Sequence, residues 1–449
     1  MSRIKNADFL KWLYPGMHIK RWLVLMLAGV AVLTLGLAYV LREAYVSGFT
    51  LPGIFYYLTL QFIPRYIRGV FFMAGAVGLM VFAVWKLNQS LLSALAPNLN
   101  TNDSVVNTIY NQRFLTRGPK IVAVGGGTGL STLLRGLKQY TTNLTAIVTV
   151  ADDGGSSGRL RRDFNVLPPG DVRNCIAALA DAEPLVTKLF QYRFTEGSGS
   201  ELAGHSFGNL FIVAMSEVVG NMEEAIRQTG RVLAVRGQII PSTLANVTLC
   251  ARTSDSRIIE GESQISESKG QARIEEVYLR PPNPAAYPEA VRAILDADII
   301  VLGPGSLYTS VLPNLLVEGV RRAVIASPAT KVYVCNVATQ PGETDGFGVK
   351  EHLHTLEGHL SPEAISCVIA NSNVEGALPQ SAKGEPVKLD GIRSNGIRLV
   401  TADVVSEDNR YHHDPAKLAQ AIMRVYYERN QVFEAPAEES DASLVGALD

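Results

Sequence analysis

The sequence has few cysteines and no excess of charge of either sign. Its four cysteines, at positions 175, 250, 335 and 367, are far apart and form no C-x-x-C pair. This spacing disfavours a zinc site or a disulfide framework and indicates reduced thiols in a cytosolic environment. Lys and Arg number 41 against 42 Asp and Glu, for a net charge of -1. Because nucleic-acid binding needs a basic surface, the composition argues against that class of partner.

Two common nucleotide-binding motifs are incomplete. Residues 120–125 predict a strand, followed by a turn with glycines and a helix over 130–140. A Walker A loop would end in Gly-Lys-Ser/Thr, but Gly129 is followed by Leu130, which disfavours a P-loop NTPase. The dinucleotide fingerprint fits Gly125 and Gly127 and lacks its third glycine, so an NAD-dependent oxidoreductase is a distant alternative. A turn rich in glycine before a helix still favours a phosphate, although a tight turn without a ligand is the other interpretation.

The first ninety residues explain much of the positive mean hydropathy of +0.13. Residues 22–41 contain no charge and match the length of a bilayer core, and residues 69–85 form a second, shorter apolar run. We expect a two-helix transmembrane hairpin over residues 1–90, because the first run is too long for the apolar part of a signal peptide. More basic residues precede the first run than separate the two runs, which predicts that the N-terminus and the rest of the chain face the cytoplasm.

Two acids and a polar turn follow the next predicted strand, residues 144–151. Asp152 and Asp153 end this strand, and the turn continues with Gly154, Gly155, Ser156 and Ser157. A second polar group, made of Asp171, Arg173 and Asn174, stands at the predicted start of a helix over 172–180. Because parallel strands bind ligands beyond their carboxyl ends, we predict a phosphate or metal site here, with Asp152 and Asp153 as the metal ligands. A solvated turn is the alternative.

Later segments repeat this order of strand, polar turn and helix. His205 and Asn209 stand where a helix over 210–219 begins, with Ser206 as its expected N-cap. A strand over 298–302 runs into the loop with Gly303, Gly305, Ser306 and Tyr308, and a strand over 331–335 is followed by Asn336 and Thr339. For His205, a role as ligand contact or general base and a structural role stay equally open.

The predicted fold is α/β, with a mostly parallel sheet flanked by helices. Residues 237–280 consist of short alternating stretches, which predict a small antiparallel β insertion without assigned chemistry. We expect a linker over 91–118, the α/β domain over 119–430 and a disordered acidic tail over 431–449.

Six motifs resemble the bacterial gluconeogenesis-factor family (YvcK-type), which is related to the phospholactate transferases of deazaflavin coenzyme synthesis (CofD-type). They are GGGTGLSTLLRGLK at 125–138, TVADDGGSSGRLR at 149–161, PPGDVRN at 168–174, GHSFGN at 204–209, GPGSLYTSVLPNLL at 303–316 and CNVATQPGETDGF at 335–347. They stand in the order of the family over residues 119–430. The membrane hairpin departs from the usual members.

The resemblance implies a Rossmann-like domain, often dimeric, that binds a UDP-sugar and affects gluconeogenic growth, cell shape and cell-wall synthesis. The loops with Gly125, Gly126, Gly127, Thr128 and Gly129 and with Gly303–Ser306 would contact the nucleotide. Asp152 and Asp153 would hold magnesium, and His205, Asn209, Asn336 and Thr339 would line the pocket. This gives a membrane-tethered nucleotide-sugar regulator at the bacterial inner membrane. The alternative is a magnesium-dependent transferase that moves a phospho-containing group from a nucleotide to an acceptor, and no residue is assigned as catalytic.

Overall fold

The computed structural model describes scattered residues between 30 and 82, and residues 115–434 except 182–183, 196–200, 269–271, 362–363, 375–383 and 390–395. The chain forms two compact units, Met1–Phe114 and Leu115–Asp449. In the first unit, residues 66–78 are helical. No helix among the described residues is long and apolar enough to cross a membrane. Most of the predicted span 22–41 and part of 69–85 lie outside the described residues, so the tether stays a prediction.

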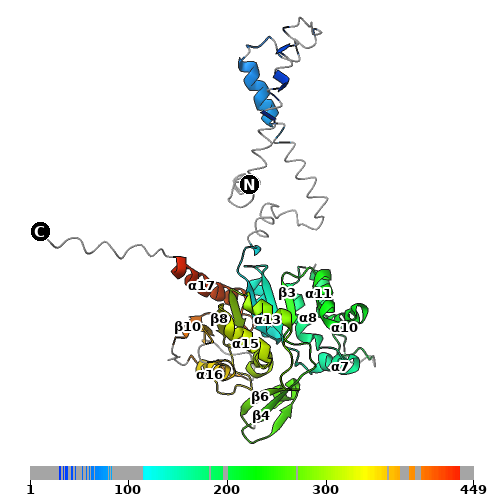
Figure 1. Ribbon diagram of the computed structural model, residues 1–449, viewed down its shortest axis with the longest axis vertical. Helices are drawn as coiled ribbons and strands as arrows, with labels where there is room; N and C mark the ends of the chain where they lie inside the picture. The colour runs from blue at the N-terminus through cyan, green and yellow to red at the C-terminus, as the bar shows by residue number, and fades with distance from the viewer. Residues whose placement is uncertain are drawn as a thin grey trace, which may run out of the picture. The chain divides into compact units, whose positions relative to one another are not determined.

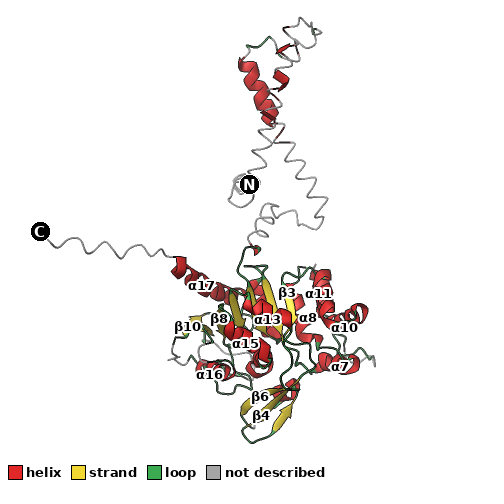
Figure 2. Cartoon of the chain, viewed as in Figure 1, coloured by secondary structure: helices red, strands yellow, loops and turns green. Residues whose placement is uncertain are grey.

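The second unit is built on a sheet of seven parallel strands (Figures 1 and 2). Its order is β10-β9-β8-β7-β1-β2-β3. The central strands are short, β-branched and buried, as expected when helices cover both faces of a parallel sheet. The strands are β1 (Ile121–Gly125), β2 (Leu144–Val148), β3 (Gln238–Pro241), β7 (Ile299–Leu302), β8 (Thr330–Val334), β9 (Cys367–Asn371) and β10 (Arg398–Ala402).

Helices pack in a layer on each face of this sheet. One layer contains α6 (Gly127–Leu137), α8 (Pro169–Leu179) and α17 (Pro415–Glu434), with α7 (Gly155–Phe164), α9 (Pro184–Gln191), α10 (Phe207–Val219) and α11 (Met222–Val232) beside α8. The other, in front of the sheet in Figure 1, contains α13 (Pro288–Leu295), α14 (Leu312–Leu315), α15 (Glu318–Ala326) and α16 (Val349–His359). A π-helix, η1 (Leu307–Val311), leads into α14. The α/β fold with a parallel sheet is confirmed.

A small antiparallel sheet projects from the lower end of this unit in Figure 1. Its order is β5-β4-β6, with β4 (Thr248–Thr253), β5 (Ile258–Glu260) and β6 (Ile274–Arg280). This confirms an antiparallel insertion but corrects its limits. Residues 238–241 are the edge strand β3 of the main sheet, and part of the stretch expected as strand is the helix α12 (Glu262–Glu267). Gly261, at φ +102°, turns the chain into α12, a conformation that favours glycine.

Candidate functional site

The strand order reverses between β1 and β7, the two central strands of the sheet. From β1 the chain continues to β2 and β3 on one side, whereas β7 to β10 follow on the other. The loops after β1 and β7 therefore diverge, and such a switch point is where open parallel sheets bind ligands. A pocket of about 230 Å³ lies there. It is lined by Gly126, Gly127, Thr128, Gly129, Thr132, Glu262, Pro304, Gly305, Ser306, Ser310, Asn336, Val337, Ala338, Gln340, Tyr411, His412 and His413.

The two glycine loops of this pocket touch each other. A Cβ atom on Gly129 would lie 2.4 Å from the carbonyl oxygen of Pro304 and 2.9 Å from the amide nitrogen of Gly305. Glycine is therefore required at position 129 for the first turn of α6 to approach the loop after β7. Gly126, the N-cap of α6, has no side chain to cap the helix. The Gly127 amide donates instead to the Asp171 carboxylate, and Gly127, Thr128 and Gly129 of this first turn line the pocket, where a helix N-terminus favours an anion.

Polar side chains connect the loop after β7 with the segment after β8. The Gly305 amide donates to Asn336 Oδ1 at 3.3 Å, and Gln340 Nε2 donates to Ser306 Oγ at 2.6 Å. Asn336 in turn donates to Gln340. Three loops at neighbouring strand ends thus form one pocket wall with amide and hydroxyl groups, which are suited to bind phosphate or sugar oxygens.

The segment before α17 completes the pocket. His413 is buried and donates from Nε2 to the Cys335 carbonyl at 3.2 Å. Burial lowers the pKa of His413 to about 4, so this imidazole is neutral at pH 7. The Tyr411 hydroxyl donates to the Thr339 carbonyl, and His412 lies exposed between these two anchored residues at the pocket. No motif was recognised here in the sequence, although the segment follows a strand end as the other loops do.

Carboxylates gather on one side of the pocket. Burial, and then repulsion by Asp152, raises the pKa of Glu262 to about 8 and that of Asp171 to about 7. Burial also raises the pKa of Asp152, and it raises that of Glu343, which accepts hydrogen bonds from Ser266 and Thr309, to about 7. Glu262 comes from the antiparallel insertion, to which the sequence assigned no chemistry. Raised pKa values at neighbouring acids indicate a place where a cation or a proton would be stabilising.

Asp153 is bonded to the antiparallel insertion. Its Oδ1 accepts a hydrogen bond of 2.9 Å from the Ser263 amide in the first turn of α12. Asp152 instead accepts from the Gly154 amide and lies near Asp171. Asp153 therefore holds the first turn of α12 in place, while Asp152 belongs to the cluster of carboxylates beside the pocket. Among the described residues no three His, Cys, Asp or Glu side chains are arranged to hold a metal ion by themselves.

Ser156, His205 and Asn209 form a separate buried cluster. Ser156 Oγ lies 3.0 Å from His205 Nδ1 and accepts a hydrogen bond from Asn209 Nδ2 at 3.1 Å. The serine proton can therefore be donated to His205, whose pKa is lowered mainly by burial. Ser206 accepts from the Asn209 amide as the N-cap of α10. The three side chains join the starts of α7 and α10 and are not among those lining the pocket.

The remaining predicted site residues lie around the pocket or away from it. Arg173 donates to Gln191 and Asn174, and the Thr339 hydroxyl accepts from the Glu385 amide. Tyr308 lines a second groove on the other side of η1. Of the site residues predicted from the sequence, those that line the pocket are Gly126, Gly127, Thr128, Gly129, Gly305, Ser306 and Asn336. The predicted residues that do not line it are Gly125, Asp152, Asp153, Gly154, Gly155, Ser156, Ser157, Asp171, Arg173, Asn174, His205, Asn209, Gly303, Tyr308 and Thr339.

Comparison with known proteins shows the family to which the chain belongs. Residues 121–405 match the family described as "2-phospho-L-lactate transferase CofD". A putative gluconeogenesis factor from Nostoc sp. is 45% identical over 437 residues, covering 93% of both chains. The gluconeogenesis factor of Bacillus subtilis is 45% identical over 320 residues, covering 69% of this chain and 99% of its own.

A solved structure from Bacillus halodurans, described as a member of the upf0052 family, has the same fold. It aligns with a TM-score of 0.64 and 41% identity, covering 68% of this chain and 99% of its own. The matches to the Bacillus proteins span about the length of the second unit, whereas the Nostoc match is longer than that unit. The chain belongs to the CofD family and, within it, to the gluconeogenesis factors.

Proposed function

We propose that this chain is a regulator that binds a nucleotide sugar, with a UDP-sugar as the ligand, in the pocket between the loops after β1 and β7. The observation that carries the proposal is the contact between Gly129 and Pro304, which brings two glycine loops and the first turn of α6 to one pocket. A diphosphate is the ligand group that such a site favours. The amide and hydroxyl groups of Asn336, Gln340 and Ser306 would contact the remaining polar atoms of the ligand.

Magnesium would bind together with the diphosphate. Mg²⁺ usually takes one or two protein carboxylates, with phosphate and water oxygens as its other ligands. The raised pKa values of Asp152 and Glu262 fit such a cation, because a positive charge would stabilise both carboxylates. We assign magnesium to these two residues rather than to Asp152 and Asp153, since Asp153 is bonded to α12. When bound, the ion would neutralise the diphosphate charge.

The regulator would be tethered to the inner membrane by residues 22–41 and 69–85, act as a homodimer, and support gluconeogenic growth, cell shape and cell-wall synthesis. In the helical stretch 66–78, Val70, Phe71 and Met73 are more than 60% exposed, as expected for side chains that contact lipid. The names of the curated relatives support the metabolic part. A strain without the protein should grow on glucose and fail on a gluconeogenic carbon source. In the wild-type strain, the protein should be found in the membrane fraction.

The binding experiment is a calorimetric titration of the full-length protein with UDP-N-acetylglucosamine, with and without magnesium. The bound ligand is then recovered and analysed for chemical change. We expect binding that magnesium strengthens, with the ligand recovered intact. No heat of binding at millimolar ligand would contradict the proposal.

A transferase is the second candidate, because the family match carries a transferase description. Asp171 and Glu262, with pKa values of about 7 and 8, are also able to accept a proton from an attacking hydroxyl near neutral pH. Binding of GDP in preference to UDP-sugars, or turnover of the recovered nucleotide, would favour this candidate. The magnesium requirement is common to both, so the nucleotide preference and the fate of the ligand separate them.

A further inference from the structure

An apolar surface covers the outward sides of α9 and α10, and α10 lies at the edge of the second unit in Figure 1. We propose that this surface, the α9–α10 face, binds a second copy of the chain, with the two α10 helices antiparallel about a twofold axis at Ala214. The proposal names the surface of the homodimer proposed above and rests on that homodimer. It does not depend on which nucleotide the pocket binds.

The burial pattern of α10 is the reverse of that of an ordinary surface helix. Its inward side includes Gly208, Asn209 and Ser216 beside two apolar residues. Its outward side has Glu217 at one margin and is otherwise apolar, with exposed or half-buried Phe207, Leu210, Phe211, Ala214, Met215 and Val218. Val218 is 81% exposed. Because a surface helix normally directs polar residues outward, an outward side of this kind indicates a face that a partner covers.

The helix α9 extends this apolar surface. Leu185 and Leu189, one turn apart, are 75% and 49% exposed, and Tyr192 is exposed about one turn further along. The Phe207 amide donates to the Tyr192 carbonyl at 2.8 Å, so the end of α9 lies beside the start of α10. The two helices therefore present one continuous face and not single scattered apolar side chains.

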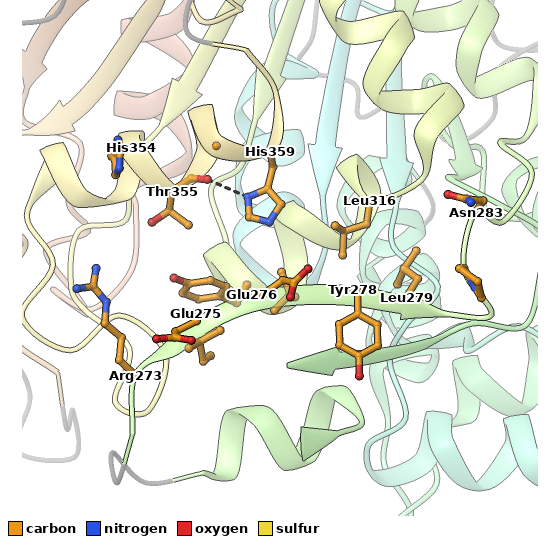
Figure 3. Close-up of a pocket in the computed structure, with 15 residues that line it drawn as sticks. Arg273, Glu275, Glu276, Tyr278, Leu279, Asn283, Leu316, His354, Thr355 and His359 are labelled. Carbon is orange, nitrogen blue, oxygen red and sulfur yellow. Dashed lines mark hydrogen bonds between the residues drawn. The ribbon is translucent and has the colours of Figure 1, made fainter. Parts of the chain in front are cut away.

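The groove beside β6 differs from this face. It is a cavity of about 800 Å³ between β6 and α16, and charged and polar side chains line it, among them Arg273, Glu275 and His359 (Figure 3). Solvated charges of both signs favour no particular occupant. Exposed Phe, Leu, Met and Val side chains, by contrast, gain free energy when they leave water. Association through the α9–α10 face is therefore stabilising in itself.

The charges of the two helices favour a second copy of the chain as the occupant. The helix α9 contains one charged residue, Lys188, and α10 contains one of opposite sign, Glu217. A face with one charge of each sign is complementary to itself when a twofold axis relates two copies. An anionic membrane surface would instead require several cations around the apolar residues. Homodimer interfaces are also more apolar than transient ones, and interface cores are enriched in aromatic residues and Met.

Ala214 fits the position on the twofold axis. It is exposed near the middle of the outward side of α10, and its small side chain permits close approach of two helices. In an antiparallel pair centred there, Glu217 of one helix faces Phe211 of the other, because both lie three positions from the centre. The Phe211 and Phe190 rings are 6.0 Å apart between their centres, and Phe190 is two residues from Lys188. The axis thus brings Glu217 of one copy toward Lys188 of the partner subunit.

Cysteine cross-linking of the full-length protein tests this axis. All four natural cysteines are buried, so a cysteine introduced on the α9–α10 face is readily distinguished from them. A residue on a twofold axis meets its own copy, and Ala214→Cys should therefore form a disulfide-linked dimer on mild oxidation, measured by non-reducing electrophoresis. Gly358→Cys, at an open position of α16, is the matched control and should give no linked dimer.

Two pairs of variants in the Ala214→Cys protein test the face and its charges. Leu189→Glu should lower the yield of linked dimer by about tenfold or more, because it puts an unpaired charge into an apolar interface. Leu295→Glu, at a residue of α13 that is 47% exposed, is the matched control and should leave the yield unchanged. Lys188→Glu should lower the yield a few-fold by repulsion from Glu217 of the partner subunit, and adding Glu217→Lys should restore it.

Sedimentation of the wild-type protein separates failure of this interface from failure of the homodimer. A monomer at all concentrations would overturn both. A dimer in which Ala214→Cys gives no linked product, or one that Leu189→Glu leaves unchanged, would overturn the α9–α10 interface alone. The same conclusion would follow if the double charge reversal failed to restore linkage, or if Ala214→Cys became linked in cells to a different protein.

Discussion

Replacing Gly129 with alanine should weaken nucleotide binding without preventing folding. The added Cβ would meet the Pro304 carbonyl oxygen at 2.4 Å, where ordinary contact begins near 3.4 Å. The loop after β7 must therefore move by about 1 Å, because both atoms belong to rigid backbone and not to a flexible side chain. Overpacking of this kind costs about 1–3 kcal/mol, and the higher helix propensity of alanine offsets up to about 1 kcal/mol.

The net loss of unfolding free energy is then at most about 3 kcal/mol, and each kcal/mol lowers Tm by about 2–4 °C or less in a domain of this size. The effect on the ligand is of similar free energy, because a shift of 1 Å removes good geometry from hydrogen bonds to a charged phosphate, each worth about 1.5–3 kcal/mol. We expect the affinity for UDP-N-acetylglucosamine to fall by about 10–100-fold. Calorimetry measures the affinity and a thermal melt measures Tm on the same sample.

Gly358→Ala is the matched control. Gly358 also lies within a helix, α16, but a Cβ atom there would meet nothing within 4 Å. This variant should keep the wild-type affinity and a Tm at least as high. Unchanged affinity in Gly129→Ala would refute the assignment of the two glycine loops as the phosphate site.

Three further changes test other parts of the site. Asp152→Asn should remove the gain in nucleotide affinity that magnesium gives, at least tenfold, and leave the affinity in EDTA unchanged; calorimetry under both conditions checks this. Ser156→Ala should lower the unfolding free energy by about 1–3 kcal/mol in urea titrations, since it leaves buried groups of His205 and Asn209 unpaired, yet should not change nucleotide affinity. His413 stays neutral in the fold down to pH about 4, whereas an unfolded histidine binds a proton below about 6.5; the stability it contributes is therefore present above pH 6.5 and lost as the pH falls to 4. The unfolding free energy of wild type should drop by about 3 kcal/mol more than that of His413→Asn over this range.

The sequence predicted those parts of the site that depend only on the order of neighbouring residues along the chain. A β-branched strand followed by glycine and a helix defines the loops after β1 and β7, and the rule for parallel sheets places their ends together. Gly129 and Ser306 follow from that reasoning without any knowledge of long-range contacts. The same strand-end rule, applied to residues 403–413, would have found His412 and His413.

The parts of the site that the sequence did not predict depend on contacts between residues that are far apart in the chain. Asp153 looks equivalent to Asp152 in the sequence, and its role depends on Ser263, which lies 110 residues later. Glu262 enters the pocket because β4, β5 and α12 fold back over the ends of the parallel strands. This placement determines which charged groups surround the carboxyl group of Glu262. Tyr308 was expected at the ligand, but the π-helix η1 changes the direction of successive side chains relative to an α-helix and directs Tyr308 into the other groove.

The π-helix η1 lies between the nucleotide pocket and the groove beside β6. Ser306 and Ser310 line the nucleotide pocket, Tyr308 lines the groove beside β6, and Thr309 donates to Glu343 between them. A five-residue π-helix is a rare and weakly stabilised conformation that is frequent at functional sites.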